Sequence, residues 1–73
     1  MKAWPVPSKG PLQILVHGIE KSDELKVYDI SGKLIQKHFI ENDKPLNIVL
    51  PVAGTYIIRL TNNNDLVLKA VIE

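Results

Sequence analysis

The residues of this chain that could do chemistry are few, and their spacing does not assemble a catalytic group. His17 and His38 are the only imidazoles, they fall in separate predicted strands, and neither has a carboxylate at a metal-ligand spacing. The chain has no cysteine, so thiolate ligands and disulfides are excluded. We interpret both histidines as ordinary strand residues and expect no metal and no cofactor.

The hydroxyl groups and the remaining acids lead to the same expectation. Nucleophilic catalysis needs a hydroxyl or thiol that a positioned base activates. The three serines each stand beside a Pro, Lys or Gly in a predicted loop, which is typical of turns: Ser8, Ser22 and Ser31. Asp29-Ile30-Ser31-Gly32 weakly resembles the Asp-Ser-Gly of aspartic proteases, but an extra Ile intervenes and a second catalytic Asp would be needed. The run 62–65 could bind calcium in principle, but only Asp65 is charged, so we interpret it as a turn. We therefore expect that the protein is not an enzyme.

Composition limits the fold and the partners. A chain of 73 residues and 8.2 kDa with 45% hydrophobic residues has room for one small domain. Val and Ile account for 16 residues and Ala for 3, which favours strands over helices. The net charge of +1 argues against a nucleic-acid partner, and nothing indicates a small-molecule substrate. No apolar run reaches the ~20 residues of a membrane-spanning helix, and residues 1–5 are too short and proline-interrupted for a signal peptide.

Alternation of apolar and polar residues then predicts the elements. Strands are expected at about 12–17, 25–30, 33–40, 46–50, 55–61 and 66–72, and a seventh at the N-terminus is left open. A loop is expected over 18–24, a tight turn at 31–32, a second turn at 41–45, a break after the strand at 51–54 and a loop tip at 62–65. Short strands joined by short turns predict an all-β antiparallel sandwich rather than a barrel. The predicted core is Leu12, Ile14, Val16, Leu25, Val27, Leu34, Ile48, Tyr56, Ile58, Leu60 and Leu68.

Two motifs in this order carry a resemblance to a known family. They are Val27-Tyr28-Asp29-Ile30-Ser31-Gly32-Lys33-Leu34 and, about twenty residues later, Ala53-Gly54-Thr55-Tyr56-Ile57-Ile58-Arg59-Leu60. Together they resemble the type A C-terminal sorting domains of the type IX (Por) secretion system. The opening element, Val6-Pro7-Ser8-Lys9-Gly10, lacks the family's Asn-Pro pair, and the ending, Leu68 to Glu73, closes in Glu where the family usually closes in Lys. The match runs over 6–73, which leaves 1–5 as a lead-in or linker whose first three residues are native or a cloning leader.

The resemblance implies a small immunoglobulin-like β-sandwich of six or seven strands at the end of a larger secreted protein. It implies a signal that passes through the periplasm and directs an attached N-terminal cargo domain across the outer membrane to the cell surface or the medium. The implied partners are the type IX outer-membrane translocon and a sortase-like peptidase. The residues with the best claim to translocon recognition are Lys69, Val71, Ile72 and Glu73. The family-motif turn and packing positions are Pro7, Gly10, Asp29, Gly32, Gly54, Tyr56 and Arg59.

Two other functions stay open at this point. The domain could be retained in an envelope or secretion-machinery component as a docking or signalling ligand, which the altered ending and the missing Asn-Pro pair slightly favour. It could also be a carbohydrate-binding or adhesive sandwich attached to an enzyme. That function would require several exposed aromatic side chains on one face, and the chain has only four aromatic residues in all: Trp4, Tyr28, Phe39 and Tyr56.

Overall fold

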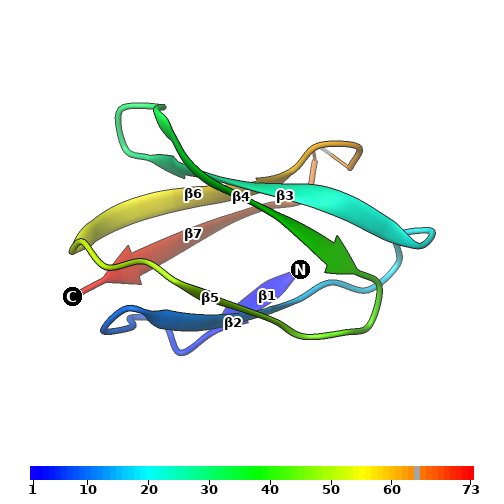
Figure 1. Ribbon diagram of the computed structural model, residues 1–73, viewed down its shortest axis with the longest axis horizontal. Helices are drawn as coiled ribbons and strands as arrows, with labels where there is room; N and C mark the ends of the chain where they lie inside the picture. The colour runs from blue at the N-terminus through cyan, green and yellow to red at the C-terminus, as the bar shows by residue number, and fades with distance from the viewer. Residues whose placement is uncertain (64) are drawn as a thin grey trace.

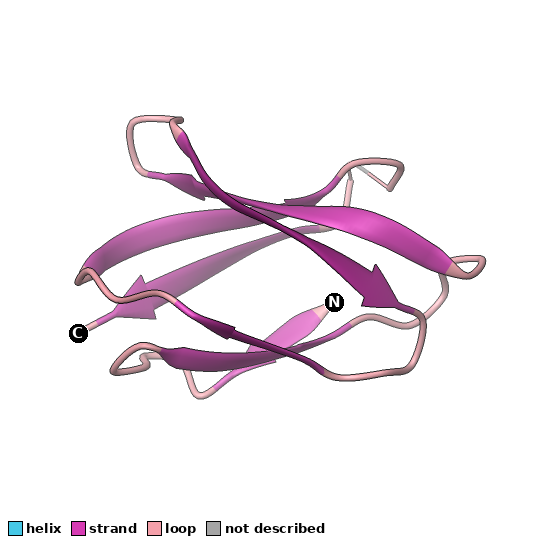
Figure 2. Ribbon diagram, viewed as in Figure 1, coloured by secondary structure: helices cyan, strands magenta, loops and turns pink. Residues whose placement is uncertain are grey.

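In the part of the chain that the structure describes, all regular structure is β (Figure 1 and Figure 2). The computed structural model describes residues 1–63 and 65–73. Its strands are β1 Lys2–Trp4, β2 Pro11–Leu15, β3 Ser22–Asp29, β4 Leu34–Glu41, β5 Leu46–Val49, β6 Gly54–Leu60 and β7 Val67–Ile72. Within the described residues no helix is long and apolar enough to cross a membrane. The all-β prediction is confirmed.

The strands form two antiparallel sheets that face each other, as Figure 1 shows. One sheet has three strands in the order β1-β2-β5, and the other has four in the order β4-β3-β6-β7. Strand β1 lies against β2 with Lys2 opposite Leu15, so the N-terminal segment supplies a seventh strand. This arrangement confirms the small antiparallel sandwich and is consistent with an immunoglobulin-like fold.

The core fills the space between the sheets and follows the two-residue period of the strands. In β6, Tyr56 and Ile58 are buried while Arg59 is exposed, because successive side chains of a strand point to opposite faces. Of the eleven predicted core residues, nine are buried. The complete buried hydrophobic set among the described residues is Leu12, Ile14, Val16, Ile19, Leu25, Val27, Ile40, Ile48, Leu50, Tyr56, Ile58, Leu60, Ala70 and Ile72.

Two predicted core residues lie elsewhere. Leu34 is 39% exposed, so its assignment to the core was wrong. The pairing of β3 with β4 shifts between Val27 and Tyr28, and this bulge places Leu34 opposite Tyr28 on the outer face. Leu68 is half-buried and packs against the edge of the core rather than within it.

The predicted loop over 18–24 is also partly wrong. Strand β3 begins at Ser22, so Ser22, Asp23 and Glu24 belong to the sheet. Ile19 is buried although its neighbours are polar, because the Asn42 side chain fixes this loop: its Oδ1 accepts hydrogen bonds from the backbone N–H of Gly18 (2.9 Å) and of Ile19 (3.2 Å). A contact over more than twenty residues gives no local sequence signal.

Candidate functional site

The C-terminal strand β7 lies at an edge of the four-stranded sheet, which makes its backbone the first candidate for recognition. It pairs only with β6 within that sheet, with Ile57 opposite Lys69 and Thr55 opposite Val71. Ile72 points into the core and is 3% exposed, whereas Lys69 is exposed and Val71 is half-buried on the outer face. An outside partner can therefore touch Lys69, Val71 and Glu73, but not the side chain of Ile72.

The end of this edge is covered by Ser8, which lies between β1 and β2. The Ser8 N–H donates to the Val71 carbonyl (2.9 Å), and the Glu73 N–H donates to the Ser8 carbonyl (2.7 Å), which forms a parallel bridge to Ile72. Ser8 is buried, and its Oγ accepts a bond from the Gly10 N–H (3.1 Å) and donates to the Pro11 carbonyl. Ser8 is thus more than the turn residue that the sequence indicated.

The rest of the β7 edge has no hydrogen-bonded strand partner in the described part of the chain, although β1 of the other sheet lies close to β7. In an antiparallel edge strand, alternate residues direct their N–H and C=O groups away from the neighbouring strand. The Ser8 bridge shows that Val71 is one of these residues, so Lys69 and Val67 are the others. Beyond Ser8, no described strand pairs with this side of β7. Such an edge can accept a strand from a partner.

The β3–β4 turn is organised by one carboxylate, as the sequence predicted. Oδ1 of Asp29 accepts bonds from the Ser31 N–H (2.9 Å), the Lys33 N–H (3.0 Å) and the Ser31 hydroxyl (2.6 Å). The bonds from the Ser31 hydroxyl and the Lys33 N–H lower the pKa of Asp29 and outweigh the opposing effect of burial. Gly32 has φ = 91°, in the left-handed region, so its predicted positive φ is confirmed.

The second motif contains strand β6 and places the ring of Tyr56 in the core. Gly54 has a positive φ of 153° and opens the strand. Two residues later, Tyr56 is 6% exposed and its hydroxyl donates to the Val52 carbonyl (2.6 Å), so the loop before β6 is held by its own strand. Among the opening residues, Gly10 also has a positive φ of 135°, while Pro7 is exposed.

Comparison with known families now decides what these motifs belong to. The family model of the secretion system C-terminal sorting domain matches residues 2–73, which is nearly the whole chain. The chain belongs to this family. No curated protein and no solved structure matches it. The domain is therefore a C-terminal sorting signal for type IX secretion, and it implies an attached cargo, contact with that secretion machinery and passage through the periplasm to the cell surface or the medium.

The titratable residues that could have formed a catalytic or metal site in the sorting domain lie apart. His17 follows β2 and its Nδ1 lies 2.6 Å from Oδ1 of Asp43 at the surface, while His38 in β4 contacts Oε1 of Gln36 (2.7 Å). No group of three or more His, Cys, Asp or Glu side chains that could hold a metal ion occurs in residues 1–63 and 65–73. Ser22 lies in β3 and Ser31 in the Asp29 turn, so the serines do not share a site either.

The sequence did not predict that a carboxylate of β3 would be buried. Asp23 is 3% exposed and receives bonds from the Glu24 N–H (2.7 Å), the Asn62 N–H (3.0 Å) and the Asn63 side-chain amide (2.8 Å). Burial raises the pKa of Asp23, but the hydrogen bonds from Asn63, Asn62 and Glu24 outweigh it, so the pKa lies below the ordinary value of 3.8. The only signal for this role was the polar Asn run itself. Asp23 ties the β6–β7 loop to the start of β3.

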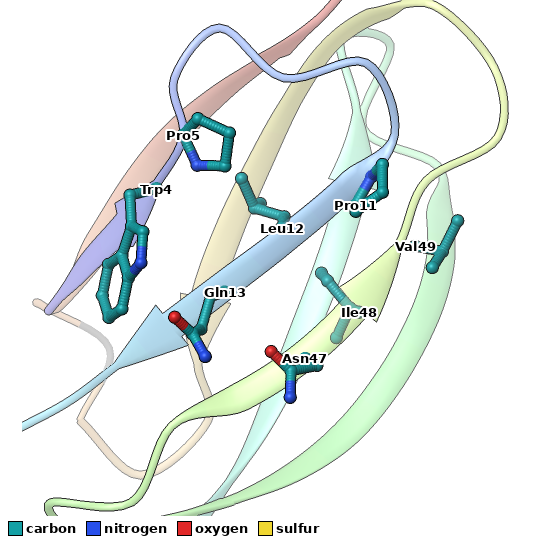
Figure 3. A pocket seen from close by; sticks show the side chains of 8 residues that line it. All are labelled: Trp4, Pro5, Pro11, Leu12, Gln13, Asn47, Ile48 and Val49. Carbon is teal, nitrogen blue, oxygen red and sulfur yellow. The ribbon is translucent and has the colours of Figure 1, made fainter.

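A groove of about 410 Å³ crosses the outer face of the three-stranded sheet (Figure 3). Trp4, Gln13 and Asn47 lie in one row across β1, β2 and β5, with Pro5 and Pro11 beside them. The groove offers one indole and two amides. Trp4 is the only aromatic residue among the described positions of this sheet, whereas the carbohydrate-binding hypothesis required several.

Proposed function

We propose that the sorting domain is read by the type IX outer-membrane translocon through the open edge of β7, and that a sortase-like peptidase then separates it from its cargo at the outer-membrane surface. The domain contributes no catalysis of its own to this process. Recognition is carried by the outward side chains of Lys69 and Val71 and by Glu73, while Ile72 contributes by holding β7 in the sandwich.

The observation that carries this proposal is the position of β7. It is an edge strand whose outward N–H and C=O groups at Val67 and Lys69, and the outward N–H of Val71, have no described strand partner. A translocon strand could pair with these groups without unfolding the domain, since strand addition uses main-chain hydrogen bonds for affinity and the alternate side chains for specificity. On the outer face those side chains are Val67, Lys69 and Val71.

A proline in β7 tests this edge. Val71→Pro removes an outward N–H and leaves the ladder to β6 intact, because proline is tolerated in an edge strand where its N–H faces away from the sheet. In a secreted reporter fused to the domain, we expect surface delivery to fall sharply. Val71→Thr is the matched control, since it keeps the N–H and a β-branched side chain, and it should be delivered normally.

The thermal unfolding of both variants should be measured alongside. Delivery of the Val71→Pro fusion at the wild-type level would refute recognition through this edge. Mass spectrometry of the delivered reporter tests the second half of the proposal, since the peptidase should leave cargo that lacks the sandwich, residues 2–73. An intact fusion at the surface would contradict removal.

A further inference from the structure

The outer face of the four-stranded sheet gathers positive charge that is scattered in the sequence. Lys37 in β4 lies directly opposite Lys26 in β3, and Lys26 lies directly opposite Arg59 in β6. Directly opposed residues of an antiparallel pair share a face and have Cβ atoms about 5 Å apart. Three cations thus form one row across three adjacent strands.

A fourth cation extends the row to the strand that carries the proposed recognition edge. Lys69 of β7 lies opposite Ile57, one position diagonal to Arg59, and it is exposed on the same outer face. We call Lys26, Lys37, Arg59 and Lys69 the basic face. The net charge of +1 for the whole chain conceals it.

The acidic residues of this sheet face neutralise the row only at Lys26. Glu24 is the outward residue of β3 just before Lys26, and Glu41 is the last residue of β4. Glu24 lies 3.6 Å from the Lys26 ammonium, and Glu41 is engaged by Lys44 outside the sheet at 3.1 Å. Among the described residues, Lys37, Arg59 and Lys69 form no ion pair within 4.0 Å. The centre of the face therefore keeps its positive charge.

Like charges placed directly opposite each other across a strand pair destabilise a sheet. This arrangement occurs in both strand pairs of the row, although a neutral or acidic residue at Lys37 or Arg59 would relieve the repulsion. Among the described residues Glu24 compensates Lys26, whereas Lys37 and Arg59 have no such ion pair, and an arrangement that opposes folding is expected at a functional position. The compensating charge is expected to come from a partner.

The surroundings of the row fit a protein surface. Arg59 and Tyr28 are diagonal neighbours on β6 and β3. They line two hollows together, one with Asp29, Ile57 and Gly32 and one with Lys26 and Thr61. Arginine and tyrosine are the residue types most often found at the centres of protein interfaces, surrounded by a polar rim. Tyr28 is half-buried and can offer both its ring and its hydroxyl to a partner.

We propose that the basic face docks on an acidic surface of a type IX machinery protein, next to the edge of β7. This inference rests on the proposed function, and it adds a second contact and its charge. The family assignment makes the machinery the partner that the domain must meet, and charge complementarity selects an acidic patch on it. Lys69 belongs to both contacts, so one partner surface could engage the edge and the basic face together.

The test compares two triple variants with the same change in net charge, both as reporter fusions in a type IX-secreting bacterium. The face variant carries Lys26→Gln, Lys37→Gln and Arg59→Gln. The control carries Lys2→Gln, Lys9→Gln and Lys21→Gln, three exposed lysines outside the basic face. We expect delivery of the face variant to fall by roughly tenfold or more, since electrostatic steering raises association rates by about 10 to 1,000-fold. The control should be delivered like the wild type.

A charge-conserving variant separates charge from side-chain shape. Lys26→Arg, Lys37→Arg and Arg59→Lys together retain every positive charge, and we expect this variant to restore delivery. Loss of delivery in the charge-conserving variant, or an equal loss in the control, would overturn the proposal. The thermal stability of the 73-residue chain should be unchanged or slightly higher in the face variant, because the like-charge row is removed.

Two further outcomes separate this inference from others. Normal delivery of the face variant, with loss in Val71→Pro, would refute the basic face and leave recognition through the edge in place. Vesicles of phosphatidylglycerol provide a lipid probe. If the wild-type domain bound them tightly and the face variant did not, a membrane would be the occupant and the protein-surface proposal would be wrong.

Discussion

Strand β3 carries an aspartate near each end. Both carboxylates accept several hydrogen bonds, but the donors of one are close in the sequence and those of the other are distant. Asp29 at its end accepts hydrogen bonds from Ser31 and Lys33, two and four residues away, at the surface. Asp23 near its start accepts them from Asn62 and Asn63, 39 and 40 residues away, and is 3% exposed. The first organises a turn, whereas the second joins two distant parts of the chain.

The difference indicates which of the two aspartates contributes more to the stability of the domain. The Asp29 turn is local and solvated, so water can replace its bonds at modest cost. The Asp23 contacts are shielded, and their donors would be left unsatisfied without the carboxylate. The family motif includes Asp29, yet we expect Asp23 to make the larger contribution to the stability of the fold.

The largest expected effect is therefore at Asp23. Asp23→Asn keeps the shape but replaces one acceptor oxygen by a donor that faces other donors. We expect a loss of about 2 kcal/mol in the free energy of unfolding, typical of an unsatisfied buried group, measured by urea denaturation. Asp29→Asn is the matched comparison and should cost clearly less. An equal loss of stability in both variants would show that Asp23 does not stabilise the fold more than Asp29 does.

The pH dependence of stability should also differ between the two aspartates. The pKa of Asp23 is below 3.8 in the folded protein because hydrogen bonds from Asn63, Asn62 and Glu24 outweigh the opposing effect of burial, whereas the unfolded chain keeps the ordinary value. The contribution of the carboxylate is thus complete well above pH 3.8 and is lost as the pH falls through the folded pKa, beginning below about pH 5.

Thermal unfolding between pH 7 and pH 2 measures this dependence. The wild-type melting temperature should fall through the acid range, and Asp23→Asn should flatten that fall more than Asp29→Asn does. The pKa of Asp29 is also lowered, by its bonds to Ser31 and Lys33, so its variant should flatten the curve in the same direction. A wild-type curve and an Asp23→Asn curve that run parallel would show that Asp23 does not contribute in this way.

An intermediate effect is expected at Gly32, within the Asp29 turn. Its φ of 91° lies in the left-handed region, while a Cβ there would meet no atom within 4 Å. The cost of Gly32→Val is therefore backbone strain alone, and we expect a loss of somewhat more than about 1 kcal/mol. Gly32→Asn should cost less, because asparagine tolerates this region. Equal losses for the two variants would mean that backbone strain is not the cause.

These residues also show what the sequence could and could not predict. Local spacing was enough to predict the Asp29 turn, the positions of the motif strands along the chain and the inward face of β6, and these predictions were correct. Asp23, Ser8 and the basic face depend on which strands lie side by side, and no local pattern encodes that. Leu34 was wrong because a one-residue shift in pairing exchanges the two faces of a strand.

The smallest expected effect is at Ser31, and it tests whether the Asp29 turn depends on any single bond. Ser31→Ala removes the hydroxyl that donates to Asp29 at 2.6 Å but keeps the Ser31 and Lys33 N–H bonds to the same oxygen. The carboxylate stays satisfied and exposed, so the melting temperature should change by only a few degrees, in line with ordinary surface substitutions of within about 0.5 kcal/mol. The pKa of Asp29 should rise toward its ordinary value, because the Ser31 hydroxyl makes the largest contribution to its lowering, and carboxyl NMR titration measures this directly. A large drop in melting temperature with no change in the pKa of Asp29 would show that the hydroxyl acts on the turn by another route.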